Sequence, residues 1–329
     1  TQIKGDSETH PEFSPNDEFA DFETYEYYIQ TSENKTAVSP GDYVRPALKS
    51  GLAIAQTIGV NPYKFGFIGS TDAHSGLASP EESNFWGKMA KDSTPETKAT
   101  VQGSPIAANG WDMSASGLAA VWATGNNREA IYAAFKRKET YATSGPRMRV
   151  QLFAGWEFPA NAERAEDFAS IGYQYGIPMG GDLTANGAEQ APQFIVRAVK
   201  DPLGANLDRV QMVKGWVNAA GEQFETVYDI DWAGERQPDA NGKLPPVGNT
   251  VDVQTARYTN SIGQAEFASR WSDPDFDPAQ RAFYYVRVLQ IPTPRNGLFD
   301  SLALQLDKPP RGAKTIQERA YTSPVWYTP

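Results

Sequence analysis

The sequence predicts an α/β region followed by an all-β region, and three observations support this fold class. Residues 39–68 contain a helical pattern followed by a short apolar run, which is the helix–strand order of an α/β fold. After residue 146, several runs alternate between apolar and polar residues, as half-buried strands do. Aromatic residues make up 12% of the chain beside 24 prolines and 28 glycines, a composition typical of many strands joined by turns.

The predicted helix of the first region has both a start signal and an end signal. Ser39-Pro-Gly-Asp42 combines an N-cap serine, a proline in the first turn and an acid three residues after the cap. Gly59 ends the pattern. Apolar residues lie between these signals at helical spacing: Val44, Leu48, Leu52, Ala55 and Ile58. A second helix is predicted to begin within residues 126–129.

The second region is predicted to consist of strands. Alternating or apolar runs lie at 148–153, 194–199, 209–213 and 283–291, and turns rich in Gly, Pro and Asn separate them. From about residue 146 onward, this pattern predicts a β-sandwich.

The most informative stretch joins a predicted strand to two polar residues. Residues 65–68 form a short apolar run between an Asn-Pro turn and a Gly-Ser step, which predicts a buried strand. Asp72 and His74 follow directly, and functional groups in parallel α/β folds collect at the carboxyl ends of strands. The pair therefore predicts a metal site. In the alternative interpretation, Asp72 caps the next helix and His74 only hydrogen-bonds within a loop.

The scarcity of histidine supports the metal interpretation. The chain has two histidines, and His10 lies, like His74, among acidic and small residues. If the two stretches meet in space, one pocket gathers both imidazoles with Asp72, and the carboxylates of Glu8 and Asp6 could join them. Nitrogen and carboxylate ligands together suit Zn, Mn or Fe better than Ca or Mg. We therefore expect His10, Asp72 and His74 to bind a divalent metal.

Nine segments carry a resemblance to a known family: 2–11, 14–23, 64–76, 84–88, 141–147, 177–182, 213–216, 291–295 and 319–326. Through them the chain resembles the bacterial domain-of-unknown-function family 3604, which is allied to the polymerase-and-histidinol-phosphatase (PHP) superfamily of metal-dependent phosphoesterases. The resemblance implies the C-terminal portion of a PHP-like distorted (β/α) barrel in residues 1–145, with the β-sandwich domain in residues 146–329.

The chain also departs from the superfamily pattern. That pattern opens with a His-x-His element and has further His and Glu ligands before its Asp-x-His element, and none of these precedes residue 72 here. We therefore expect the chain to be the C-terminal part of a longer protein. The N-terminal part of the same protein would then be its partner and would complete the metal site.

The resemblance implies a hydrolase in which metal-activated water attacks a phosphate or similar ester. Asp72 and His74 would be ligands, and His10 a ligand or a general acid. Glu8 would orient an imidazole, and Arg147 would clamp the anionic substrate with its planar guanidinium. In the structural alternative for Arg147, this side chain bridges the two domains. The functional alternative is a non-catalytic binding or structural module whose working part is the β-sandwich.

Composition narrows the partners. The chain has 40 acidic and 30 basic residues, and its net charge of −10 argues against nucleic acid. No apolar run approaches the roughly 20 residues that a membrane-spanning helix needs, so we expect no membrane insertion. The absence of cysteine excludes a thiol nucleophile. A small anionic or ester substrate remains, and we expect a periplasmic or secreted protein.

Overall fold

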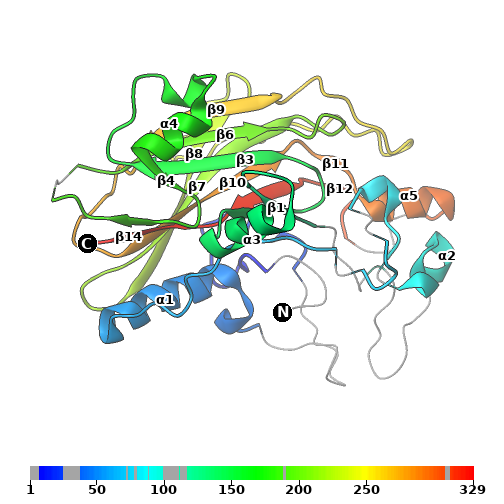
Figure 1. Cartoon of the computed structure of the whole chain (residues 1–329). Coiled ribbons are helices and arrows are strands. Elements are labelled where there is room, and N and C mark those ends of the chain that lie inside the picture. Colours follow the sequence, from blue (N-terminus) through cyan, green and yellow to red (C-terminus); the bar gives the residue numbers. More distant parts are fainter. Residues whose placement is uncertain are drawn as a thin grey trace.

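The computed structural model describes residues 7–24, 38–71, 73–77, 80–87, 89–98, 111, 117–187, 190–307 and 312–329. The fold is mixed α/β and consists mainly of strands. In Figure 1 a small sheet lies above a large sheet, and helix α1 lies below the large sheet. The described strands form open sheets, and none of these sheets closes into a barrel.

The large sheet has eight strands: β1 (Leu118–Val121), β2 (Thr140–Thr143), β5 (Asp182–Thr184), β7 (Leu207–Val217), β8 (Gln223–Trp232), β10 (Ala282–Gln290), β13 (Arg319–Thr322) and β14 (Val325–Thr328). The small sheet has four: β3 (Arg149–Gly155), β4 (Gly176–Pro178), β6 (Gln193–Val199) and β9 (Glu266–Ser272). Two short strands, β11 (Thr293–Pro294) and β12 (Thr315–Ile316), pair separately.

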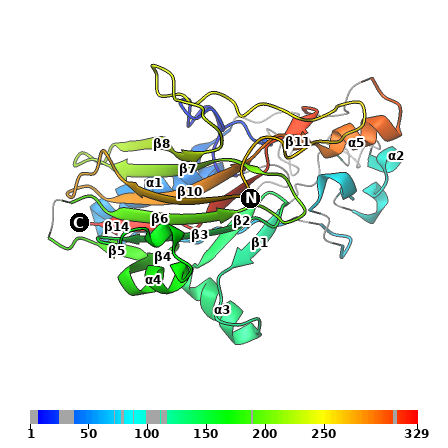
Figure 2. The same cartoon turned by 90° about the horizontal axis from the view of Figure 1, so that it is seen from above.

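The main helices are α1 (Val44–Ile58), α2 (Pro95–Lys98), α3 (Arg128–Arg137), α4 (Phe168–Tyr175) and α5 (Asn296–Ala303). Short 3₁₀ turns include η1 (Pro40–Asp42), η2 (Glu82–Asn84), η3 (Ala90–Asp92) and η5 (Ala162–Arg164). Seen from above, α3 and α4 lie to one side of the sheets, whereas α2 and α5 lie together at one end (Figure 2).

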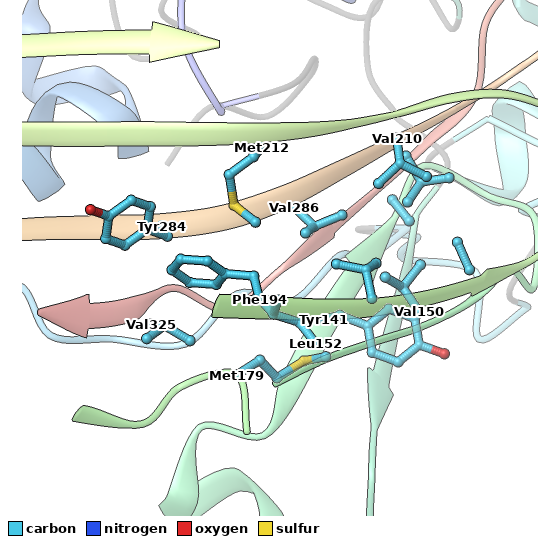
Figure 3. Close-up of a cluster of buried hydrophobic side chains, with 14 of the residues drawn as sticks. Tyr141, Val150, Leu152, Met179, Phe194, Val210, Met212, Tyr284, Val286 and Val325 are labelled. Carbon is cyan, nitrogen blue, oxygen red and sulfur yellow. The ribbon is translucent and has the colours of Figure 1, made fainter. Parts of the chain in front are cut away.

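Strand β10 is the centre of the large sheet. It pairs with β7 along its whole length, and its other edge pairs first with β14 and then with β13. Side chains alternate along it because successive residues of a strand point to opposite faces. Tyr284, Val286 and Val288 enter the core between the two sheets, part of which Figure 3 shows. Phe283 and Tyr285 face α1, where they pack with Leu48 and other apolar residues.

Local signals correctly predict several elements. Helix α1 spans the expected residues and ends at Gly59, whose φ of 80° is a conformation that glycine adopts without strain. The capping box at Ser39 is present, although it caps the 3₁₀ turn η1 directly before α1. Asn127 caps α3. The four strand runs are confirmed as parts of β3, β6, β7 and β10.

The predicted buried strand at residues 65–68 is wrong. Phe67 is buried, but Ile68 is 57% exposed, and the segment forms no regular strand. The backbone N–H of Phe67 donates to Ser323 Oγ (2.8 Å) instead of to a neighbouring strand. A Cβ on Gly69 would lie 2.7 Å from the carbonyl oxygens of Leu118 and Thr143, so the chain passes close to β1 and β2 only because this residue is glycine.

The large sheet crosses the predicted domain boundary between residues 145 and 146. Strands β1 and β2 precede that boundary, and β2 pairs with β13 near the end of the chain. The division into two domains stays a prediction. None of the helices in the described part of the chain has the length and apolarity that crossing a membrane requires.

Candidate functional site

The segment of residues 7–24, called here the N-terminal segment, folds against the start of α1. Its carbonyl oxygens at Ser7 and Glu8 accept hydrogen bonds from the first two backbone N–H groups of α1, each at 2.8 Å. These N–H groups have no partner within the helix, so the segment satisfies them. A tight turn follows, in which the carbonyl oxygen of His10 accepts from the N–H of Ser14 at 3.0 Å.

Glu8 lies in a buried ion-pair cluster that the N-terminal segment, α1 and β10 build together. One carboxylate oxygen accepts from Arg45 and from the hydroxyl of Tyr285, and the other accepts from Arg287 at 3.1 Å. Burial alone would raise the pKa of Glu8, but the charges of Arg287 and Arg45 outweigh it and lower the pKa to about 2. Glu8 is therefore ionised at neutral pH.

Asp17 completes this balanced cluster, which we define as Glu8, Asp17, Arg45 and Arg287. Arg287 binds both carboxylate oxygens of Asp17, at 2.7 and 2.9 Å, in the two-pronged geometry that suits a guanidinium. Burial opposes ionisation, yet Arg287 holds the pKa of Asp17 well below its usual range. The completely buried guanidinium groups of Arg45 and Arg287 thus each pair with both carboxylates, and Arg45 also binds Glu225 at 3.0 Å.

Phe19 anchors the middle of the N-terminal segment. Three guanidinium groups surround its ring: the Cζ atoms of Arg209, Arg287 and Arg319 lie 5.0, 5.6 and 5.9 Å from the ring centroid. Arg319 also donates to the carbonyl oxygen of Phe19 at 3.0 Å. Cation–π attraction and this hydrogen bond hold the segment on the large sheet.

His10 is buried beside this cluster, between aromatic rings. Its ring centroid lies 6.0 Å from that of Phe13 and 5.6 Å from that of Tyr43. Nδ1 accepts a hydrogen bond from the backbone N–H of Glu12 at 3.2 Å. Because this bond uses the Nδ1 lone pair, the neutral imidazole carries its proton on Nε2 and donates from there. In this form neither ring nitrogen has a free lone pair for a metal, and the role of His10 as a ligand or a general acid stays a prediction.

The loop with the second histidine is described only in part. His74 is exposed, whereas Asp72 lies outside the described residues. The N–H of Ala73 donates to Thr71 Oγ1 at 3.3 Å. Within the described residues, no three His, Cys, Asp or Glu side chains converge in a way that could hold a metal ion. The predicted convergence of His10, Asp72 and His74 stays a prediction.

Tyr285 nevertheless contacts both of the segments singled out from the sequence. Its hydroxyl donates to Glu8 in the N-terminal segment. Its ring meets the ring of Phe67 edge-on, with centroids 5.4 Å apart, at the start of the loop that leads to His74. The two segments therefore approach each other at one buried side chain of β10.

Arg147 lies apart from the balanced cluster. Its guanidinium pairs with Glu81 at 3.1 Å, and the side chain is 62% exposed. Its backbone N–H donates to Asp201 Oδ2 at 2.7 Å. Because exposed ion pairs contribute little to stability, Glu81 can release this guanidinium at low cost.

A second charge cluster, the acid-rich cluster, comprises the buried Glu318 and Arg295 and the partly buried Glu82 and Glu23. Glu318 accepts a hydrogen bond from Ser144 Oγ. Burial raises the pKa of Glu318 well above its usual range, and the charges of Glu82 and Glu23 add to the effect, whereas Arg295 acts against it. Arg295 pairs mainly with Glu23, with one hydrogen bond at 2.8 Å.

Sequence reasoning missed Asp17, Arg45, Tyr285 and Arg287. One signal was present: Arg287 interrupts the apolar run 283–291, and a charged residue inside a buried strand requires a charged partner. The partners could not be deduced, because Glu8 and Arg287 are 279 positions apart.

The fold and this cluster define a mainly β, mixed α/β protein whose N-terminal segment is held by buried ion pairs. The chain belongs to the family described as "Protein of unknown function (DUF3604)", whose model matches residues 1–329. No curated protein matches the chain, and no solved structure does either.

Proposed function

We propose that this protein is a metal-dependent hydrolase, resembling the PHP phosphoesterases, that cleaves a small anionic phosphate ester or a similar ester. The observation that supports it most is the approach of the two histidine-bearing segments at Tyr285. The donor set, imidazole nitrogen with carboxylate oxygen, suits Zn, Mn or Fe. Asp72 and His74 would hold the ion, which supplies water of lowered pKa as a nucleophile.

The residues of the chain itself have distinct roles in this proposal. His10 would direct its Nε2–H at the leaving oxygen as a hydrogen-bond donor, because the Glu12 N–H on Nδ1 keeps the proton on Nε2. To act as a general acid, the ring would first take up a proton on Nδ1 in place of that hydrogen bond. Arg147 leaves Glu81 and binds the anionic group of the substrate with its guanidinium fork. Glu8 stays ionised between Arg45 and Arg287, so it holds the turn that carries His10 and does not itself transfer a proton.

The finer architecture belongs to the same proposal. A PHP-like barrel would be completed by the N-terminal part of the same protein, and the two sheets that share one core would act as its β-sandwich domain. We place such an enzyme in the periplasm or outside the cell.

The variant His74→Ala, made in the full-length protein, tests this proposal. It removes one nitrogen donor from an exposed position, so the melting temperature should change by only a few degrees. The amount of Zn²⁺, Mn²⁺ or Fe²⁺ bound per protein should fall. The rate at which the protein hydrolyses p-nitrophenyl phosphate, or its diester, should fall by about 100-fold or more.

Ser75→Ala in the same loop is the control and should keep the metal stoichiometry and the hydrolysis rate of the wild type. If His74→Ala has the turnover and the melting temperature of the wild type, the proposal is contradicted. The alternative, a non-catalytic binding or structural module whose working part is the β-sandwich, would then be the better description.

A further inference from the structure

We propose that Tyr285 is a positioning residue, which sets the turn carrying His10 against the loop carrying His74. This inference rests on the proposed function and adds to it a residue that neither ligates a metal nor touches the substrate. Tyr285 lies in the middle of β10 and has no exposed surface. It belongs to the face of β10 that packs against α1.

The hydroxyl of Tyr285 fixes the first segment. It donates to Glu8 and accepts a hydrogen bond from Arg45 Nε at 2.8 Å. Burial raises the pKa of Tyr285 well above its usual range, so the hydroxyl keeps the proton that it donates. The backbone N–H of Arg45 also donates to the backbone carbonyl oxygen of Glu8. Both the backbone and the side chain of Glu8, two residues before His10, are thereby held.

The ring of Tyr285 fixes the second segment. Phe67 meets it edge-on, with an interplanar angle of 69°. The backbone of Phe67 is tied to Ser323, and Gly69 passes within contact of the β1 and β2 backbones. The backbone is therefore fixed at Phe67 and at Gly69, which precedes His74 by five residues.

One side chain thus has two separable contacts, a polar one with the His10 turn and an apolar one with the His74 loop. If His10 and the His74 loop act on one substrate, they must keep their relative positions closely, because a displacement of about 1 Å costs on the order of 100-fold in rate. Replacing the hydroxyl alone should therefore disturb His10 while the packing of Phe67 remains.

The test compares Tyr285→Phe with Tyr284→Phe. Tyr284 is the adjacent residue on the same strand, is equally buried, and donates its hydroxyl to Asp273 at 2.7 Å on the opposite face of the sheet. Both variants lose one buried hydroxyl, so both should lose similar stability. The chain has two histidines, so ¹⁵N-histidine labelling gives one set of imidazole signals for each, and NMR reports their tautomers directly.

In Tyr285→Phe we expect the His10 signals to change from a single Nε2–H tautomer to a mixture of tautomers. Turnover should fall about 10- to 100-fold in kcat, with KM and metal stoichiometry nearly unchanged. Tyr284→Phe should keep the wild-type His10 signals and kcat. Identical His10 signals in Tyr285→Phe and the wild type would overturn the inference.

Two further readouts keep the outcomes distinct. If Tyr285→Phe does not fold, Phe67→Leu probes the other contact and should shift the His74 signals while the His10 signals stay in place; unshifted His74 signals would overturn the inference. If the wild type neither binds metal nor hydrolyses esters, the proposed function fails. The NMR comparison of His10 still decides whether Tyr285 positions the turn.

Discussion

The balanced cluster and the acid-rich cluster bury similar groups with opposite results. Glu8 and Glu318 are both glutamates with almost no exposed surface. The pKa of Glu8 is lowered to about 2, whereas that of Glu318 is raised well above its usual range. Burial acts in the same direction on both, because removing a carboxylate from water always disfavours its charged form.

The difference comes from the number of cations. In the balanced cluster, Glu8 and Asp17 each contact both Arg45 and Arg287. Arg45 also binds Glu225, and Lys49 supplies a further cation to that carboxylate. In the acid-rich cluster, the described residues place Arg295 against three carboxylates, and it binds Glu23 most directly. Local charge balance, more than depth of burial, decides whether a buried acid is ionised.

The largest expected effect is the loss of a cation from the balanced cluster. Arg287→Met removes one of the two arginine partners of Asp17 and one of the two of Glu8, and leaves these buried carboxylates incompletely paired. The free energy of unfolding should fall by about 3–5 kcal/mol, measured by urea denaturation.

The exposed Arg147→Ala should change the same quantity by less than about 0.5 kcal/mol. A small loss in Arg287→Met would mean that the cluster is not the electrostatic anchor that its geometry suggests.

The next effect is acid sensitivity caused by the balanced cluster. A carboxylate whose pKa is lower in the folded chain than in the unfolded chain stabilises the fold fully above the unfolded value. For Glu8 this contribution should disappear as the pH falls from the ordinary 4.5 toward about 2, and Asp17 acts in the same direction. The loss from Glu8 should be on the order of 3 kcal/mol.

Urea denaturation between pH 6 and pH 2 measures this loss. In Asp17→Asn the curve should be flatter over the acidic range, because one of the two titrating groups is gone. An equally steep curve would assign the acid sensitivity to other carboxylates.

The smallest expected effect belongs to the acid-rich cluster and has the opposite sign. The raised pKa of Glu318 contributes stability that is fully present below the ordinary value of 4.5 and is lost as the pH rises through the folded value. Glu318→Gln mimics the protonated acid, so its stability should lie within about 1 kcal/mol of the wild type at pH 4.

At pH 9 the variant should be the more stable of the two. Thermal denaturation at both pH values measures the difference. A variant that is less stable than the wild type at pH 9 would indicate that Glu318 is ionised and paired in the folded protein.

The sequence by itself determined the elements whose signals are local. Helix α1 follows from its apolar spacing and from Gly59, and α3 begins at its cap residue Asn127. The strand runs of β3, β6, β7 and β10 follow from their alternation or apolar character. Such signals depend on the few residues within one turn of helix or one pleat of strand, so they can be read without knowing the fold.

Only the tertiary structure decided how the charged residues pair. Glu8 was singled out from the sequence, but its partners Arg45, Tyr285 and Arg287 lie 37, 277 and 279 positions away. Residues 65–68 have the local pattern of a strand, but the backbone N–H of Phe67 donates to the Ser323 hydroxyl. The next residue, Gly69, passes close to the backbones of β1 and β2. Pairings of this kind depend on which strands become neighbours, and no local pattern encodes that choice.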